Sequence, residues 1–169
     1  MSAAQPQPRP QPQPRLVAKA QPEIGWTPAD RIEPGEYPAY SRSAKVYRDP
    51  QFNRWVCAIQ FDVMDAALLK MLARLTWFLN LGSEHQPHAG RRSLYWSAWC
   101  AANGGKPPAR RDRLSPDVFV KRQAIVRVAD TAQDHLQRPV SEGNCYSVIR
   151  AIVSWNTGAT GRFSDQTIN

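Results

Sequence analysis

The sequence lacks the marks of a membrane, secreted or disulfide-stabilised protein. It has no apolar run near the roughly 20 residues that a membrane-spanning helix needs, and its first residues hold no apolar core like that of a secretory signal. Its cysteines are odd in number, far apart, and set in apolar stretches: Cys57, Cys100 and Cys145. We therefore expect buried thiols without a disulfide or zinc framework, in a cytoplasmic or nucleoid-associated protein.

Familiar catalytic motifs are also missing. The sequence has no P-loop, dinucleotide glycine fingerprint, HExxH helix or nucleophile elbow. His85 and His88 flank a proline and lack an evident third ligand, so a surface loop is favoured over a metal site. Asp62 and Asp65 could hold magnesium as in a nuclease, but a turn and a helix cap are favoured. We expect a protein that is not an enzyme and uses no metal or cofactor.

The composition shows an excess of positive charge instead. The chain has 169 residues, enough for one domain, with 42% hydrophobic residues, a formal net charge of +8 and a pI near 9.9. Residues 36–169 carry +7 of that charge. A protein this basic usually meets a polyanion, and nucleic acid is the expected partner. The alternative is charge that only keeps the protein in solution.

The two ends of the sequence differ from its middle. Residues 1–22 read MSAAQPQPRPQPQPRLVAKAQP and cannot bury a core, because proline and glutamine dominate them. Such an arm is extended and is expected to act as a tether, with phosphate contact or a proline-reading partner as alternatives. We expect a disordered tail and linker over 1–35, one domain over 36–156 and a flexible tail over 157–169.

The hydrophobic pattern predicts a mainly β domain. The cleanest signal is the alternation of apolar residues from Trp55 to Val63, at the period of two that a half-buried strand shows. Residues 66–81 are ambiguous between helix and strand, and a short turn or helix followed by a strand is favoured. The expected elements are strands over 37–48, 54–63 and 73–81, a helix over 93–102, and strands over 118–130 and 145–155.

This order of elements predicts the fold class. A helix between the third and fourth of five strands is the order found in an OB-fold, a small and partly open barrel. We therefore expect a β-rich α+β domain, built as a small five-stranded OB-like barrel with one helix between strands three and four. Other small α+β domains share parts of this pattern.

Several stretches also carry a resemblance to known sequences. They are PGEYPAYSRSAKVYRDPQFNRWVCAIQFDV, RLTWFLNLG, YWSAW, DRLSP, FVKRQAIVRVADT and YSVIRAIVSW. Together they resemble small hypothetical proteins encoded on phages, plasmids and integrated mobile elements, often near replication genes. The resemblance implies an accessory role in mobile-element DNA metabolism, and it supplies no active-site motif.

The polar faces of the strands combine cations with aromatic rings. If the apolar face of each strand is core, the opposite faces are exposed, and such faces suit single strands: cations meet phosphates and rings stack on unpaired bases. A second small core under the rings is the alternative. The residues expected there are Arg74 and Phe78, Lys121 and Arg127, Tyr146 and Arg150, and, depending on the phase of the first strand, either Tyr40, Arg42 and Arg48 or Lys45 and Tyr47.

The densest charge lies in the loop over 106–113, which follows the predicted helix. With a basic pair before the helix, this loop could form one phosphate-binding patch, and a solvated loop is the alternative. Its contacts would not specify sequence. The cations are Arg91, Arg92, Lys106, Arg110, Arg111 and Arg113.

The sequence therefore favours a non-enzymatic accessory protein that binds single-stranded DNA or RNA, has no membrane partner and is compatible with an oligomer. One rival is a mobile-element inhibitor or adaptor that binds a protein of a host replication or defence complex. A second is a duplex binder with its helix in a groove, although Tyr95, Trp96 and Trp99 suit a core better. The third is the metal-dependent nuclease.

Overall fold

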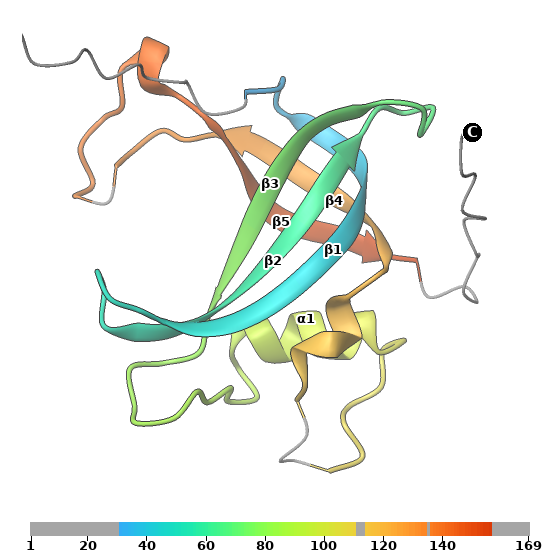
Figure 1. Cartoon of the computed structure of the whole chain (residues 1–169), viewed down its shortest axis with the longest axis vertical. Coiled ribbons are helices and arrows are strands. Elements are labelled where there is room, and N and C mark those ends of the chain that lie inside the picture. Colours follow the sequence, from blue (N-terminus) through green and yellow to red (C-terminus); the bar gives the residue numbers. More distant parts are fainter. Residues whose placement is uncertain (1–30, 111–113, 135, 157–169) are drawn as a thin grey trace, which may run out of the picture.

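Five strands and one α-helix form the protein in the computed structural model, which describes residues 31–110, 114–134 and 136–156 (Figure 1). The predicted tails over 1–22 and 157–169 lie outside these ranges. None of the helices in the described ranges is long and apolar enough to cross a membrane. The elements are β1 (Gly35–Asp49), β2 (Arg54–Met64), β3 (Met71–Asn80), α1 (Leu94–Ala102), β4 (Gln123–Asp130) and β5 (Ser147–Trp155), with short 3-10 helices η1 (Pro116–Phe119) and η2 (Glu142–Asn144).

The strands form one antiparallel sheet in the order β3-β2-β1-β4-β5. The expected β-rich fold with a helix between the third and fourth strands is confirmed. The sheet curls, so that its two edge strands β3 and β5 contact each other (Figure 1). No β-ladder joins these two edges in the described part of the chain, so hydrogen bonds do not close the sheet into a barrel.

Strand β1 is long and changes partner along its length. Its first half pairs with β4 and most of its length pairs with β2, with a register shift between Ser41 and Ser43. The buried Ser41 holds this bulge, because its backbone N–H donates to the Arg122 carbonyl at 2.8 Å and its hydroxyl donates to the Phe119 carbonyl. A bulge shifts the alternation of side chains between the two faces. Both phases proposed from the sequence are therefore partly right.

The ambiguous segment over 66–81 is a tight turn followed by a strand. The Asp65 side chain holds the turn, because its carboxylate accepts from the backbone N–H groups of Leu69 and Lys70 at 2.8 and 3.2 Å. Asp65 is thus a turn residue, as expected, although no helix follows it. Strand β3 then alternates buried and exposed positions, with Leu75 and Trp77 among the buried ones.

The predicted strand over 118–130 begins too early. Strand β4 starts at Gln123, and the 3-10 helix η1 occupies the preceding residues. Ser115 caps η1, because its hydroxyl accepts from the Asp117 backbone N–H. Pro116 suits the first helical position, because its ring fixes φ near the helical value. The apolar residues that suggested a strand here flank Phe119, which is fully buried in the core.

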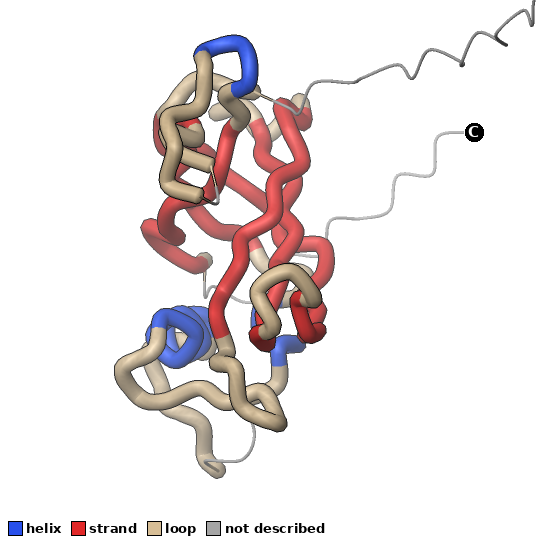
Figure 2. Tube along the Cα trace, turned by 90° about the vertical axis from the view of Figure 1, so that its left-hand side faces the viewer, coloured by secondary structure: helices blue, strands red, loops and turns tan. Residues whose placement is uncertain are grey.

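Helix α1 covers one end of the curled sheet, opposite the loop over 131–146 (Figure 2). Its buried face includes Tyr95 and Trp99, whose polar atoms donate to the carbonyls of Leu114 and Ser115 at 2.8 and 2.9 Å. Buried aromatic side chains of this kind need such a partner for their polar atom. The ring of Tyr95 meets Phe119 edge-on at a centroid distance of 5.6 Å. The helix therefore uses its aromatic face for the core.

Candidate nucleic-acid interface

The outer face of β1, β2 and β3 carries an exposed ring beside a cation. The register aligns Lys45 with Ala58 and Ala58 with Phe78, and these three residues are called the Phe78 row. Phe78 is 57% exposed, and Lys45 is exposed at the other end of the row. Strands lie about 4.8 Å apart, so roughly 10 Å separate the two backbones. Because the middle residue is alanine, no large side chain lies between the ring and the cation within this row.

The neighbouring positions extend this surface. Tyr47 is two residues after Lys45, so it lies on the same face of β1. It is 41% exposed and adds a second ring next to the Phe78 row. On the other side, Gln60 and Thr76 are cross-strand neighbours with polar side chains. Lys45 forms no ion pair with any residue that the structure describes. The surface therefore offers two rings and one uncompensated cation.

A carboxylate holds two arginines further along the same face. Tyr40, Asp62 and Arg74 are cross-strand neighbours, and they are called the Asp62 row. Asp62 accepts from Arg74 at 2.8 Å and lies 3.4 Å from Arg42. Its side chain is only 16% exposed, whereas those of Arg42 and Arg74 are 49% and 41% exposed.

This arrangement leaves the two arginines available to an anion. Each guanidinium has five donors, and the single carboxylate cannot use them all. The group keeps a net charge of +1 while the carboxylate fixes where the arginines lie. Asp62 lies within β2 itself and forms ion pairs with both arginines, so it is not the turn residue that its position in the sequence suggested.

Arg48 belongs to the opposite face of the β1–β2 hairpin. It pairs in register with Trp55, and its guanidinium lies 5.9 Å from the centre of that indole ring. Its nitrogens donate to the Asn53 side-chain oxygen at 2.8 and 3.0 Å. The structure therefore separates Arg48 from Tyr40 and Arg42, with which it was grouped.

The two cations predicted on the fourth strand have different surroundings. Lys121 lies before β4 rather than on it, in a left-handed conformation with φ of 58°, and its backbone N–H donates to the Ser41 carbonyl at 2.9 Å. It is exposed, and this bond to Ser41 places its backbone beside the β1 bulge. Arg127 is on β4, where it pairs with Glu36 at 2.7 Å. Its charge is therefore already compensated.

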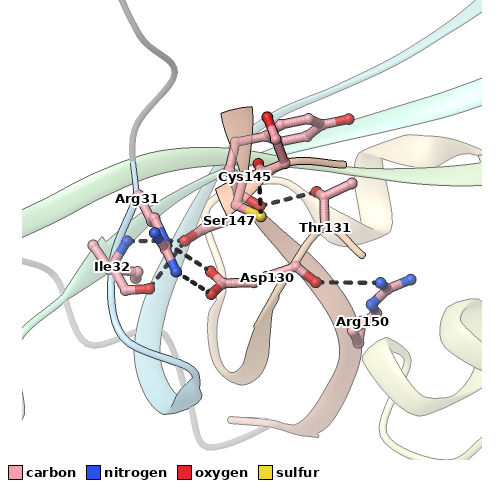
Figure 3. Close-up of polar contacts among 9 residues, drawn as sticks. Arg31, Ile32, Asp130, Thr131, Cys145, Ser147 and Arg150 are labelled. Atoms are coloured by element: carbon pink, nitrogen blue, oxygen red, sulfur yellow. Dashed lines mark hydrogen bonds and ion pairs between the residues drawn. The ribbon is translucent and has the colours of Figure 1, made fainter. Parts of the chain in front are cut away.

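The ring and cation predicted on the fifth strand are held differently from those on β3. Tyr146 immediately precedes β5 and is 40% exposed, and its carbonyl accepts from the backbone N–H and hydroxyl of Thr131, both at 2.9 Å. The Arg150 guanidinium donates to the Asp130 carbonyl at 3.5 Å (Figure 3). Because β3 and β5 are opposite edges of the sheet, Phe78 and Tyr146 do not share a row.

Residues 31 and 32, which precede β1, form hydrogen bonds with the end of β4 and the start of β5. Arg31 pairs with Asp130 at 2.8 Å, and this hydrogen-bonded pair raises the pKa of the guanidinium (Figure 3). Ile32 exchanges two hydrogen bonds with the Ser147 hydroxyl, at 2.9 and 3.1 Å. Contacts with the sheet thus begin before residue 36, where the domain was expected to start.

The cations around α1 lie at the end of the molecule that carries this helix (Figure 1). Arg91 and Arg92 are exposed in the turn before it, and the Arg91 guanidinium lies 5.9 Å from the Trp96 ring centre. Lys106 and Arg110 are exposed in the loop after it. The other two predicted cations of this loop, Arg111 and Arg113, lie outside the described residues.

The two histidines considered as metal ligands lie on the surface, and two other titratable side chains lie in the core. His85 and His88 are exposed in a loop, and the described residues contain no cluster of three His, Cys, Asp or Glu side chains that could hold a metal ion. Burial raises the pKa of the Cys57 thiol to about 12. Burial also raises the pKa of Tyr95. Both groups are therefore neutral at physiological pH and are part of the core.

The residues that complete the surface are Lys45, Tyr47, Ala58 and Asp62. The sequence offered the first two only as one phase of the strand, and no residue pattern marks the bulge that places both Tyr40 and Lys45 on the outer face. The small size of Ala58 is visible in the sequence. Its position between a ring and a cation depends on register, which the sequence does not state.

Comparison with known proteins adds no family to this description. No protein-family model matches the chain, and no curated protein matches it. The interpretation of the surface therefore depends on its own residues and geometry.

Proposed function

We propose that this protein is a non-enzymatic accessory protein that binds single-stranded nucleic acid on the outer face of β1, β2 and β3. The observation that carries the proposal is the Phe78 row, in which an exposed ring and an unpaired cation flank an alanine. Rings that stack on unpaired bases and cations that meet the backbone are the two elements of single-strand recognition. The mobile-element role implied by the resemblance is part of this proposal.

An OB-like barrel is the second part of the proposal. Strand order β3-β2-β1-β4-β5, with contact between the edge strands, is the order of an OB-type barrel opened between its third and fifth strands. The position of α1 across one end of the sheet also agrees with this fold (Figure 1). OB-folds bind oligonucleotides on the face that includes their second and third strands. That face contains the Phe78 row.

The geometry supports a specific mode of binding. One base stacks on Phe78 and a neighbouring base on Tyr47, while Lys45 meets a phosphate between them. Arg42 and Arg74 meet another phosphate, about 13 Å away, since the Asp62 row lies four residues along the strands. Stacking is tolerant of base identity and phosphate contacts carry no sequence information. The expected binding is therefore strong in low salt and weakly selective.

The test compares a fluorescently labelled single strand with the duplex of the same sequence, at low and high salt. The wild-type protein should prefer the single strand, and its affinity should fall steeply with salt because bound counterions are released. Phe78→Ala should weaken single-strand binding by about 1–3 kcal/mol, or roughly 5- to 150-fold. Duplex binding should change little, because paired bases do not stack on an external ring.

Two results would contradict the proposal. The first is equal affinity of the wild-type protein for single strand and duplex, with no effect of Phe78→Ala. The second is no measurable affinity for either at low salt. That second result would favour the alternative function, a mobile-element inhibitor or adaptor that binds a host nucleic-acid-processing complex.

A further inference from the structure

The turn between β2 and β3 exposes apolar side chains at the end of the molecule opposite α1 (Figure 1). Leu69 is 86% exposed, and Leu68, Met71 and Leu72 are 46%, 47% and 37% exposed. We call residues 65–72 the hairpin tip. Single exposed leucines are ordinary, but a contiguous apolar patch on a soluble protein marks an interaction surface.

Hydrogen bonds within the turn hold the hairpin tip. The Asp65 carboxylate accepts from two backbone N–H groups of the turn, and the backbone N–H of Leu68 donates to the Asp65 carbonyl at 3.0 Å. Leu68 has a φ of 60°, a left-handed conformation that a leucine adopts only at a cost and that glycine or asparagine would adopt more easily. The turn therefore holds an apolar side chain where its geometry favours a small or polar one.

A pocket of about 660 Å³ lies at the base of the same hairpin. Its lining includes Met64 and Leu68 from the β2–β3 hairpin, and Pro38, Tyr40 and Ile125 from β1 and β4. We call this cavity the Met64 pocket. An apolar projection and an apolar hollow thus lie side by side, and Leu68 belongs to both.

We propose that the hairpin tip and the Met64 pocket form a two-fold contact between two copies of this protein, with Leu69 of each copy inserted into the pocket of the other. A two-fold contact requires a self-complementary surface, because the same patch serves both partners. An apolar projection beside an apolar hollow meets this requirement. An unrelated partner would need only one of the two features.

The charges of the tip are also self-complementary. Lys70 is exposed and forms no ion pair within the described ranges, and Asp65 lies at the other end of the same turn. Across a two-fold axis, Lys70 of one copy approaches Asp65 of the other. The local charge of the tip is therefore balanced, although the whole protein carries +8.

This contact does not depend on the proposed function. The hairpin tip starts β3 and Phe78 lies seven residues further along it, about 23 Å away on an extended strand. Each copy therefore keeps its Phe78 row exposed. Two residues of the Asp62 row, Tyr40 and Asp62, are shared, since both also line the Met64 pocket.

Sedimentation velocity of the full-length chain over a range of concentrations tests the proposal. The wild-type protein should form a dimer. Leu69→Glu should raise the dimer dissociation constant by about 100-fold or more, because it buries an unpaired charge in the pocket. Leu136→Glu is the matched control, since Leu136 is 58% exposed but belongs neither to the hairpin tip nor to the lining of the Met64 pocket, and this variant should dimerise like the wild type.

A second variant tests the pocket. Ser154 is exposed and lines the pocket, so Ser154→Trp should fill the cavity and also prevent dimerisation. Thermal melting checks that each variant remains folded. A wild-type protein that stays monomeric at every concentration overturns the proposal and leaves the tip for a different partner. Dissociation by Leu136→Glu as strong as by Leu69→Glu overturns it too, as does a dimer unaffected by Ser154→Trp, which would place the contact outside the pocket.

Discussion

An aromatic residue and an arginine, four residues apart, occur at both edge strands of the sheet. Arg74 precedes Phe78 by four residues on β3, and Tyr146 precedes Arg150 by four residues at β5. On β3 the arginine is held by Asp62 and the ring stands free. On β5 the arginine turns to a backbone carbonyl at the end of β4. Equal spacing therefore gives two different surfaces.

The difference comes from the neighbouring strands. Strand β3 lies beside β2 and then β1, so its outer face continues over Ala58 to Lys45. Strand β5 lies beside β4 and then β1, but there its row continues from Ala151 to Arg127 and Glu36, which already form an ion pair. A ring and a cation on one strand thus form a candidate binding surface only when the adjacent strands add small and unpaired residues.

The largest expected effect checks which face of β3 is core. Trp77→Ala should destabilise the protein by about 3–5 kcal/mol, because Trp77 is 6% exposed and its removal leaves a cavity. Phe78→Ala, one residue away, should change stability much less, since that ring is 57% exposed. Denaturant unfolding of the two variants measures both. Comparable destabilisation by Phe78→Ala would mean that its ring is part of a second core.

The next prediction compares the rings of the two edges. Phe78→Ala should weaken single-strand binding by about 1–3 kcal/mol. Tyr146→Ala should weaken it by less, because no unpaired cation among the described residues lies in register with that ring on a neighbouring strand. Anisotropy titrations of both variants with one labelled oligonucleotide give the two values. A larger loss with Tyr146→Ala would move the binding surface to β5 and the loop over 131–146.

The elements themselves were largely predictable from the sequence. The alternation from Trp55 to Val63 suffices to predict β2, since a half-buried strand must alternate. The start of β4 was predicted wrongly because Val118 and Val120 have strand spacing. The stretch Ser115-Pro116-Asp117, which favours a short helical turn, was the better signal.

The candidate surface was less predictable than the elements. Exposure of Phe78 and Arg74 follows from the alternation of β3 alone. The neighbours of Phe78 follow from strand order and register, which no local pattern encodes. The bulge after Ser41 adds one residue to β1 and reverses the facing of every later side chain, with no mark in composition.

A smaller effect is expected from single cations. Lys45→Ala should weaken single-strand binding and reduce the slope of log affinity against log salt by about 0.7, the value for one phosphate contact. Arg127→Ala is the matched control, because Arg127 is also exposed on a strand but is paired with Glu36. Its slope should change less. Equal changes would show that only net charge matters, and not the Phe78 row.

The smallest expected effect comes from the carboxylate of the Asp62 row. Asp62→Asn keeps the shape of the side chain but removes the charge that occupies Arg42 and Arg74, so a phosphate can take its place between them. Single-strand affinity should therefore rise, by less than about 1 kcal/mol, since ion pairs whose arginines are 41–49% exposed are screened by solvent and contribute no more than this. Stability should fall by a similarly small amount, because both ion pairs with Asp62 are lost. Anisotropy and melting measure the two changes.

A nuclease would behave in the opposite way: the wild-type protein would cut nucleic acid with magnesium, and Asp62→Asn would abolish cutting. A loss of affinity without any cutting would show instead that the carboxylate's main role is to position the two arginines for phosphate.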